Sequence, residues 1–332
     1  MIHQYKSNGY NIVMDVESGA VHVVDDVTYD VIALFEDTEI SKIVEQLSDK
    51  YDKADIEEAI SEVNQLKEDG QLFTQDIYQP FIEEFKDKRQ TVVKALCLHI
   101  AHDCNLACKY CFAEEGEYHG RRAMMSFEVG KKALDFLVAN SGSRVNLEVD
   151  FFGGEPLMNW DVVKQLVEYG RSLEESNHKK FRFTLTTNGV LLNDEIMEYL
   201  NKEMSNVVLS LDGRKEVNDR MRPFRTGKGS YDLIVPKFQK LAESRNQEKY
   251  YIRGTFTRNN LDFSNDIMHF ADLGFKQMSI EPVVGDESDP YAIREEDLPK
   301  IREEYDKLAK MMIEREKEGK GFNFFHFMID LN

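Results

Sequence analysis

Hydrophobic and polar positions follow two different periods along most of this chain. From residue 94 onward, short apolar or alternating runs rich in β-branched and aromatic residues are separated by longer segments in which apolar residues recur every three or four positions. The first pattern is typical of strands and the second of amphipathic helices. We predict strands at 95–100, 145–151, 181–186, 206–211, 250–257 and 276–282, and helices at about 126–140, 160–178, 192–203, 230–245, 261–273 and 296–317.

Strand–helix units in succession predict an α/β fold, because a parallel strand needs a crossover helix to return the chain. We expect a partial (β/α)6 TIM-like barrel with its helices outside. Several strands also carry one polar face, as where Asn146, Glu148 and Asp150 alternate with apolar residues. A parallel strand buried on both faces normally reads as apolar throughout. The polar faces therefore predict a lumen that holds a polar ligand, with edge or solvent-facing strands as the alternative.

Residues 1–80 show a separate pattern. Strands are expected at 10–15 and 20–24, with a weaker one at 2–6, and three helical patterns follow them. Strands followed by three helices predict a small winged-helix-like domain. Residues 81–93 are polar and mixed in charge, which suits a linker, so the barrel core is expected to span 94–332.

The chain is strongly acidic, with 61 acidic and 42 basic residues and a formal net charge of −19. This charge disfavours a nucleic acid partner, because phosphates need basic neutralisation. It favours a basic partner such as a positively charged peptide, although it could serve solubility alone. No segment approaches the roughly 20 apolar residues of a membrane helix. We therefore expect a cytoplasmic protein without a membrane partner.

Three of the four cysteines, Cys104, Cys108 and Cys111, form a CxxxCxxC motif just after the first barrel strand. Active sites of such barrels lie at the carboxyl ends of the strands. Three thiolates can hold a [4Fe–4S] cluster and leave one iron free for another ligand. Cys97, within the strand, is expected to be a small buried hydrophobic residue.

A structural zinc site is the rival interpretation of the motif. Structural zinc takes four ligands, usually from two CxxC pairs, and this chain has no second pair. Its 3-then-2 spacing is also unusual for zinc. The fourth ligand would have to be His99, His102 or His119.

Polar clusters follow the next strands at the same expected edge. Glycines in Gly153-Gly154-Glu155-Pro156 would let the backbone approach a ligand closely. Thr186-Thr187-Asn188-Gly189 ends the third strand, and Ser210-Leu211-Asp212-Gly213 ends the fourth. Each could be a simple turn, but several polar strand ends in succession indicate a site. Arg222 could pair with a ligand carboxylate, with Arg220 and Arg225 as alternatives.

These motifs, in this order, resemble the radical S-adenosylmethionine (SAM) superfamily, in particular its branch with SPASM C-terminal domains. Residues 1–80 resemble the peptide-recognition element of enzymes that modify ribosomally made peptides. Stretches such as Gly-Tyr-Asn-Ile-Val and His-Ile-Ala-His-Asp-Cys-Asn-Leu are similar to the thioether-forming maturases of SCIFF peptides. The resemblance covers essentially the whole chain.

The resemblance implies two cofactors, a [4Fe–4S] cluster and SAM. The cluster ligands would be Cys104, Cys108 and Cys111. Tyr110 would contact adenine, Ser210 the ribose and Arg222 the carboxylate of SAM. The amino group would lie at Gly153, Gly154 and Glu155, and Thr187 and Asn188 would complete the cofactor-binding set.

It also implies a reaction, in which reductive SAM cleavage gives a 5′-deoxyadenosyl radical that leads to thioether cross-links in a cysteine-rich precursor peptide. The partners would be that peptide, with a basic leader, and an electron donor such as flavodoxin or ferredoxin. No cysteine follows Cys111, so we expect the SPASM region to be absent and SAM cleavage to occur without efficient cross-linking. The alternatives are another maturase, such as an epimerase or a sulfatase-maturase-like enzyme, and a truncated peptide-binding fragment without catalysis.

Overall fold

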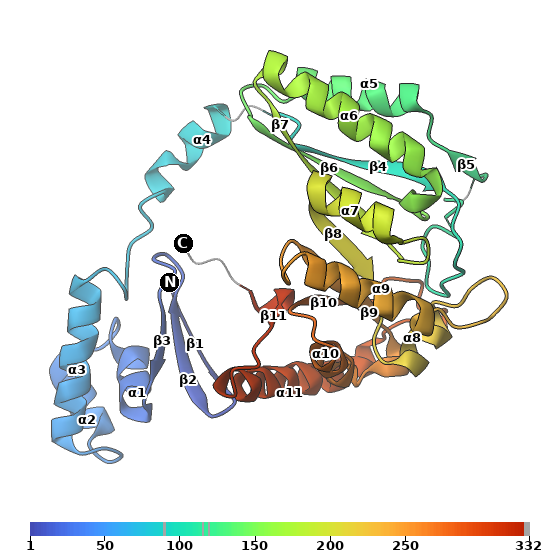
Figure 1. Ribbon diagram of the computed structural model, residues 1–332. Helices are drawn as coiled ribbons and strands as arrows, with labels where there is room; N and C mark the ends of the chain where they lie inside the picture. Colours follow the sequence, from blue (N-terminus) through green and yellow to red (C-terminus); the bar gives the residue numbers. More distant parts are fainter. Residues whose placement is uncertain (89–90, 115, 119, 329–332) are drawn as a thin grey trace. The chain divides into compact units, whose positions relative to one another are not determined.

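The computed structural model describes residues 1–88, 91–114, 116–118 and 120–328. The chain forms two compact units, Met1–Gln90 and Thr91–Met328 (Figure 1). Each has its own hydrophobic core. Within the described residues, no helix is both long and apolar enough to cross a bilayer.

The first unit is a three-stranded antiparallel sheet followed by helices, as the sequence predicts. Its sheet has the order β1-β2-β3. The completely buried Val13, Val31 and Ile56 join the sheet to the helices. Whether this unit acts as a winged-helix-like recognition domain stays a prediction. Its elements are β1 (Ile2–Ser7), β2 (Tyr10–Asp15), β3 (Val21–Val24), α1 (Asp26–Leu34), α2 (Ile40–Leu47) and α3 (Lys53–Glu68).

The segment predicted as a linker has structure of its own. A 3-10 turn at Gln79–Phe81 leads into the short helix α4 (Ile82–Lys88). The polar, mixed-charge composition suggested a loop, but it is also compatible with a solvent-exposed helix. Residues 89–90 of the predicted linker, like His119, lie outside the described residues.

The second unit contains an eight-stranded sheet with the order β11-β10-β9-β8-β7-β6-β4-β5. All neighbours pair in parallel except β4 and β5. The mixed α/β prediction with a parallel sheet is therefore confirmed, and the sheet is consistent with a partial barrel. The strands are β4 (Ala95–His102), β5 (Ala123–Met124), β6 (Asn146–Gly153), β7 (Lys180–Thr187), β8 (Met204–Ser210), β9 (Tyr250–Phe256), β10 (Gln277–Pro282) and β11 (Asn323–Phe324).

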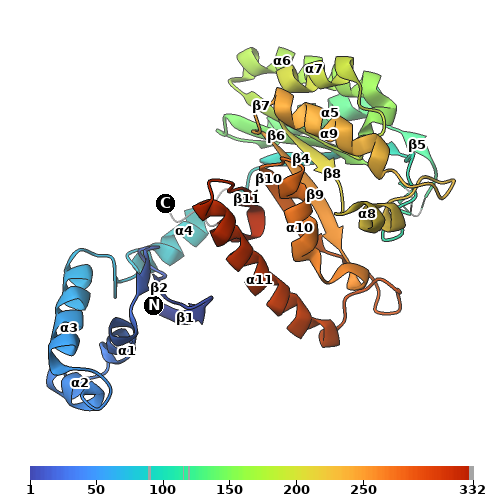
Figure 2. The same cartoon turned by 60° about the horizontal axis from the view of Figure 1, so that its bottom comes forward.

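Helices cover the outer face of this sheet (Figures 1 and 2). Alternate residues of the strands pack beneath them. On β6, for example, Leu147, Val149 and Phe151 are buried in the core. The helices are α5 (Phe127–Asn140), α6 (Trp160–Asn177), α7 (Asp194–Glu203), α8 (Lys215–Met221), α9 (Tyr231–Ser244), α10 (Phe263–Asp272) and α11 (Leu298–Lys317).

The other face of the sheet carries the polar residues that the alternation predicts. Cys97 of β4 lies beside Asp150 of β6, which lies beside Thr184 of β7. Farther along the sheet, Ser210 of β8 is paired with Arg253 of β9. The expectation that Cys97 is buried is wrong, because its side chain is exposed on this inner face.

Candidate functional site

The three-cysteine motif lies in the loop after β4 and is fastened to the turn that follows α8. Leu106, only 1% exposed, anchors the loop and forms a β-bridge with Phe224. The Ala107 N–H donates to the Pro223 carbonyl at 2.9 Å, and a similar bond follows two residues later. These backbone bonds fix the loop that carries the cysteines against the segment that carries Arg222.

The glycine pair after β6 lets two backbone segments touch. Gly153 has a φ of +121°, which L side chains rarely adopt. The Gly154 N–H donates to the Ala101 carbonyl at 2.7 Å. A Cβ on Gly154 would lie 2.1 Å from the carbonyl oxygen of Asp103, which is backbone and cannot easily move. Glycine is therefore required where β6 packs against the start of the cysteine loop.

We expect Gly154→Ala to lower stability by roughly 1–3 kcal/mol, because the new methyl group displaces the cysteine loop. The variant should also bind less iron on reconstitution. Gly120→Ala is the matched control, since the same Cβ there would meet its nearest atom at an ordinary 3.5 Å. Denaturant unfolding and iron analysis of both variants measure the difference. Equal stability and iron content in the two would contradict this account.

Glu155, predicted with Gly153 and Gly154 to hold the amino group of SAM, makes hydrogen bonds within the chain. Its side chain is 1% exposed and does not line the cavity described below. Its carboxylate accepts hydrogen bonds from the Thr187 hydroxyl at 2.8 Å and from the Asn188 N–H at 2.8 Å. Burial raises the pKa of Glu155, and these bonds counteract that effect. Glu155 thus ties the end of β7 to the glycine turn, so a positioning role fits better than direct contact with a ligand.

Asn188 in turn links the end of β7 to the cysteine loop. Its side-chain amide donates to Asn105 Oδ1 at 2.7 Å and lies 3.6 Å from the Cys104 sulfur. Its own Oδ1 accepts from the Val190 N–H at 3.0 Å. Hydrogen bonds at both the nitrogen and the oxygen of the Asn188 side chain therefore fix the orientation of its amide group.

A buried polar cluster joins the cysteine loop to the end of β8. The Tyr110 hydroxyl lies 2.8 and 2.7 Å from the two carboxylate oxygens of Asp212. Arg222 donates to the same hydroxyl at 2.8 Å and lies 3.7 Å from Asp212. Sequence reasoning noted Asp212 at a strand end but gave it no role. The sequence signal was an aspartate directly before Gly213 at the end of a predicted strand, and in the structure this glycine has a φ of +145°.

These elements surround one cavity of about 500 Å³ at the carboxyl ends of the strands. It is large enough for a cofactor-sized ligand. Of the residues predicted for the site, all but Glu155 line it. They are Cys104, Cys108, Cys111, Tyr110, Gly153, Gly154, Thr187, Asn188, Ser210 and Arg222. Residues that the sequence did not suggest for the cofactor site also line it, among them Phe112, Phe152, Arg253, Thr255 and Val283.

The three arginines considered for a carboxylate partner lie in different places. Arg222 lines the cavity, whereas Arg225 bonds to the Cys104 carbonyl and to Asp103. Arg220 donates to the Asn259 carbonyl. Nε of Arg222 is buried and has no partner among the described residues, so it can still serve a ligand.

The donor chemistry fits an iron–sulfur cluster. Burial raises the pKa of Cys104 to about 12 and that of Cys108 to about 11, so metal must displace their protons on binding. No group of three His, Cys, Asp or Glu side chains in the described part of the chain is placed to ligate a single metal ion. Thiolates spread around a larger cluster do not need to meet at one point.

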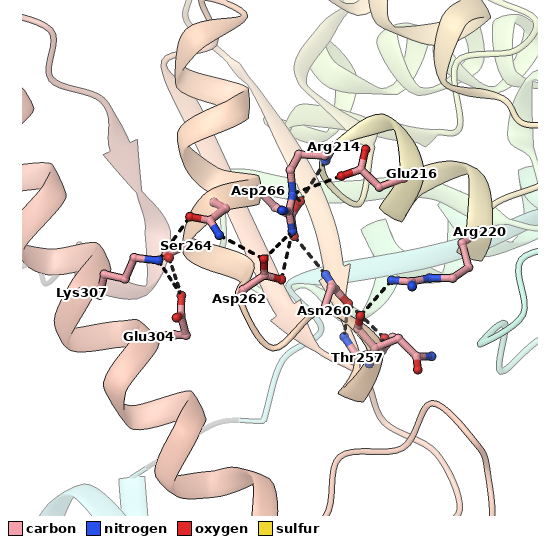
Figure 3. A network of polar contacts seen from close by, with 12 residues as sticks. Arg214, Glu216, Arg220, Thr257, Asn260, Asp262, Ser264, Asp266, Glu304 and Lys307 are labelled. Carbon is pink, nitrogen blue, oxygen red and sulfur yellow. Dashed lines mark hydrogen bonds and ion pairs between the residues drawn. The ribbon is translucent and has the colours of Figure 1, made fainter.

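A second polar network holds the loop after β8 from behind (Figure 3). Arg214 donates to the buried Asp266 at 2.7 Å and to Asp262 at 2.9 Å. Asn260 donates to the other Asp266 oxygen at 3.2 Å. A Cβ on Gly213 would lie 2.4 Å from Asp266, so the loop packs directly on this network. Asp212 is thus supported from α10 as well as from the cysteine loop.

The sheet is parallel and barrel-like, and it carries a three-cysteine loop and a ligand cavity at its strand ends. These features are those of a class of protein that would hold an iron–sulfur cluster beside a second ligand. Residues 98–254 match the family model of the radical SAM superfamily. This segment is therefore similar to a radical SAM domain, and that family implies a [4Fe–4S] cluster and SAM.

Named proteins share parts of this chain. It is 27% identical over 191 residues to the radical SAM cyclopropyl synthase TigE of Paramaledivibacter caminithermalis, covering 54% of this chain and 39% of that protein. It is 28% identical over 205 residues to a cysteine-type anaerobic sulfatase-maturating enzyme of Clostridium novyi, covering 59% and 54%. The structure of anSMEcpe with bound AdoMet and Kp18Cys peptide matches with a TM-score of 0.62 and 21% identity, covering 71% and 64%. The chain therefore matches less than two thirds of each of these proteins.

Proposed function

We propose that this chain is a radical SAM peptide maturase that forms Cys-derived thioether cross-links in a ribosomally made, cysteine-rich peptide. The observation that carries the proposal is one cavity that is lined by all three cysteines of the motif and by the strand-end residues. The likeness to a sulfatase-maturating enzyme and to a peptide-bound structure supports a peptide as the partner.

Within this cavity, Cys104, Cys108 and Cys111 would ligate the cluster. When bound, the cluster and SAM supply a 5′-deoxyadenosyl radical by reductive cleavage of SAM. Gly153 and Gly154 bring backbone to the wall where the amino group would bind. Arg222 lines the cavity and would bind the SAM carboxylate, since its Nε is unpartnered among the described residues.

Other residues of the chain hold this geometry. Glu155 fixes Thr187 and Asn188, and Asp212 fixes Tyr110 and Arg222. Ser210 lines the cavity next to the end of β8, in reach of a ribose. The polar inner face continues from the cavity, and the peptide would enter there.

The deciding experiment uses the anaerobically reconstituted chain with SAM, a reductant and a synthetic copy of the cysteine-rich peptide encoded nearest to its gene. We expect 5′-deoxyadenosine by chromatography and only an inefficient loss of two hydrogens per cross-link by mass spectrometry, because no cysteine follows Cys111 to hold a further cluster. Efficient cross-linking would contradict that expectation, and deoxyadenosine without any change in peptide mass would contradict thioether formation by this chain alone. No deoxyadenosine would contradict the proposed enzyme.

A second candidate is maturation of a sulfatase-type cysteine, which the 28% identity to the Clostridium novyi enzyme favours. The same assay with a peptide containing a sulfatase cysteine motif separates the two. Oxidation of its cysteine to an aldehyde would favour this candidate over the thioether reaction.

We further propose that residues 1–80 bind the leader of the peptide. The unit is acidic and its sheet has an edge strand, β3, whose Val23 is 66% exposed, so a basic leader could add as a further strand. Deleting residues 1–80 should abolish leader binding in a titration while the remaining core still cleaves SAM. Unchanged leader affinity after the deletion would rule out this role.

A further inference from the structure

Buried polar atoms without a partner are concentrated around the inner face of the sheet. The described part of the chain has five such side-chain atoms, on Asn105, Tyr118, Asp150, Arg222 and Arg315. Arg222 lines the cavity, and Asn105 follows the first cysteine of the motif. Enclosing a polar atom without a hydrogen bond costs free energy, so such an atom in a native site needs a partner from outside the chain, either a ligand or a water molecule. Asp150 and Tyr118 are not used by the proposed cofactor site.

Asp150 lies on the inner face of the sheet, toward the amino end of β6 from the cofactor cavity, a region called the floor below. It lies two residues before Phe152, which lines the cavity from the same face of β6. Two residues span about 7 Å along a strand. It is paired with Cys97 on one side and Thr184 on the other. Its side chain is only partly buried, so one part remains reachable from the lumen while Oδ1 is enclosed.

No cation in the described residues forms an ion pair with this carboxyl group. Burial raises the pKa of Asp150 to about 6, and Arg253 offsets this only in part from a distance. By contrast Glu148, on the same face of the same strand, has Lys94 at 3.5 Å and Arg182 at 3.6 Å. Of these two carboxyl groups on one face of β6, the more exposed Glu148 has cationic partners and the more buried Asp150 has none among the described residues.

Aromatic and polar groups lie between Asp150 and the cysteine loop. The Tyr118 ring lies 4.4 Å from that of His99, and the His99 ring lies 6.1 Å from that of Phe152 on the cavity wall. Tyr118 is also within electrostatic range of Cys97, which neighbours Asp150. The Tyr118 hydroxyl is buried and unpartnered among the described residues. The floor thus offers an acceptor, Asp150, beside rings that could flank a side chain.

We propose that Asp150 is a substrate-recognition residue that receives a hydrogen-bond donor of the peptide, an N–H or O–H from a basic or hydroxyl side chain next to the reacting position. This rests on the proposed peptide-modifying function. A donor there would satisfy the enclosed carboxylate oxygen, and the Phe152 and Tyr118 rings would pack against the stem of the side chain. The site would select which residue of the peptide lies below the SAM cavity.

The test measures binding by calorimetry to the complete chain, loaded with cluster and SAM. The probes are N-acetyl-lysine amide, N-acetyl-arginine amide and N-acetyl-serine amide, and N-acetyl-norleucine amide serves as the probe without a side-chain donor. We expect at least one donor probe to bind about tenfold more tightly than the norleucine probe. Asp150→Leu should remove this preference, and Asp150→Asn should remove it for the cationic probes. Glu148→Gln, the matched control, should leave it unchanged.

Two results would overturn the proposal. One is equal affinity of the donor and norleucine probes for the wild-type chain, and the other is an undiminished preference in Asp150→Leu. If Asp150→Leu does not fold, as judged by iron content and thermal unfolding, the nearly isosteric Asp150→Asn variant decides the question with the cationic probes. If the serine probe alone shows a preference, a preference in Asp150→Asn equal to that in Glu148→Gln is taken as binding of a neutral donor at Asp150. The assay needs no turnover, so a failed maturation reaction would count against the proposed function and not against this site.

Discussion

Replacing Cys104, Cys108 and Cys111 together with alanine is expected to abolish cluster binding and SAM cleavage. All three cysteines line the cavity, and thiolates are the normal protein ligands of a [4Fe–4S] cluster. Iron and sulfide analysis after anaerobic reconstitution should give about four irons per wild-type chain and none in the variant. The deoxyadenosine assay should fall to background, because the electron that cleaves SAM passes through the cluster.

Cys97→Ala is the control for nonspecific iron on thiols. Cys97 is exposed on the inner face and does not line the cavity, so its removal should leave the iron content unchanged. Iron retained by the triple variant would contradict the assignment of the ligands. Stoichiometric zinc in the wild-type chain, with no iron after reconstitution, would contradict the cluster itself.

The strands and helices of the second unit could be predicted because each is long enough to show its period. The six predicted strands all form, with ends that differ by at most two residues. The strands β5 and β11 were missed because a segment of two residues shows no periodicity. The helix α8 was missed because its seven mostly polar residues form less than two helical turns, too few to show an apolar face. The side that each strand presents to the lumen was also readable, since alternation fixes it.

The candidate site was predictable as a set of strand ends and not as a set of contacts. Parallel strands bring their carboxyl ends to one edge, so Gly153, Thr187 and Ser210 had to lie close together. Which side chain faces the ligand depends on local backbone turns that no periodicity encodes. Glu155 turns away to bond Thr187 and Asn188, and Asp212, given no role, holds Tyr110.

Asp212→Ala is expected to have the largest effect on stability among single changes at the site. Asp212 is completely buried, and it accepts hydrogen bonds from Tyr110 and from the Thr255 N–H. Its loss would leave the guanidinium of Arg222 buried without a carboxylate, a change that typically costs about 3–5 kcal/mol. Denaturant unfolding of the cluster-free chain measures this, and SAM affinity after reconstitution should fall as well.

Tyr110→Phe and Asp212→Asn separate the causes. Tyr110→Phe removes the hydrogen bond to Asp212 and the one from Arg222 but keeps the charge pair, so its cost should be about 1–3 kcal/mol and below that of Asp212→Ala. Asp212→Asn keeps the shape and an acceptor, so it should cost less than Asp212→Ala. If Ala and Phe variants were equally stable, the charge on Arg222 would not need Asp212.

The difference in stability between the wild-type chain and Asp212→Asn should change with pH in a definite direction. Burial raises the pKa of Asp212 from its ordinary 3.8 to about 6, so the folded chain holds a proton that the unfolded chain releases between these values. The protonated carboxyl is thus favoured in the folded state, and the wild-type chain loses this contribution as the pH rises through 6. Asn cannot titrate, so the stability advantage of wild type over Asp212→Asn should shrink between pH 5 and pH 8, both chains being measured without cluster. An advantage that grows with pH would instead mean that the Arg222 pairing outweighs the burial of Asp212.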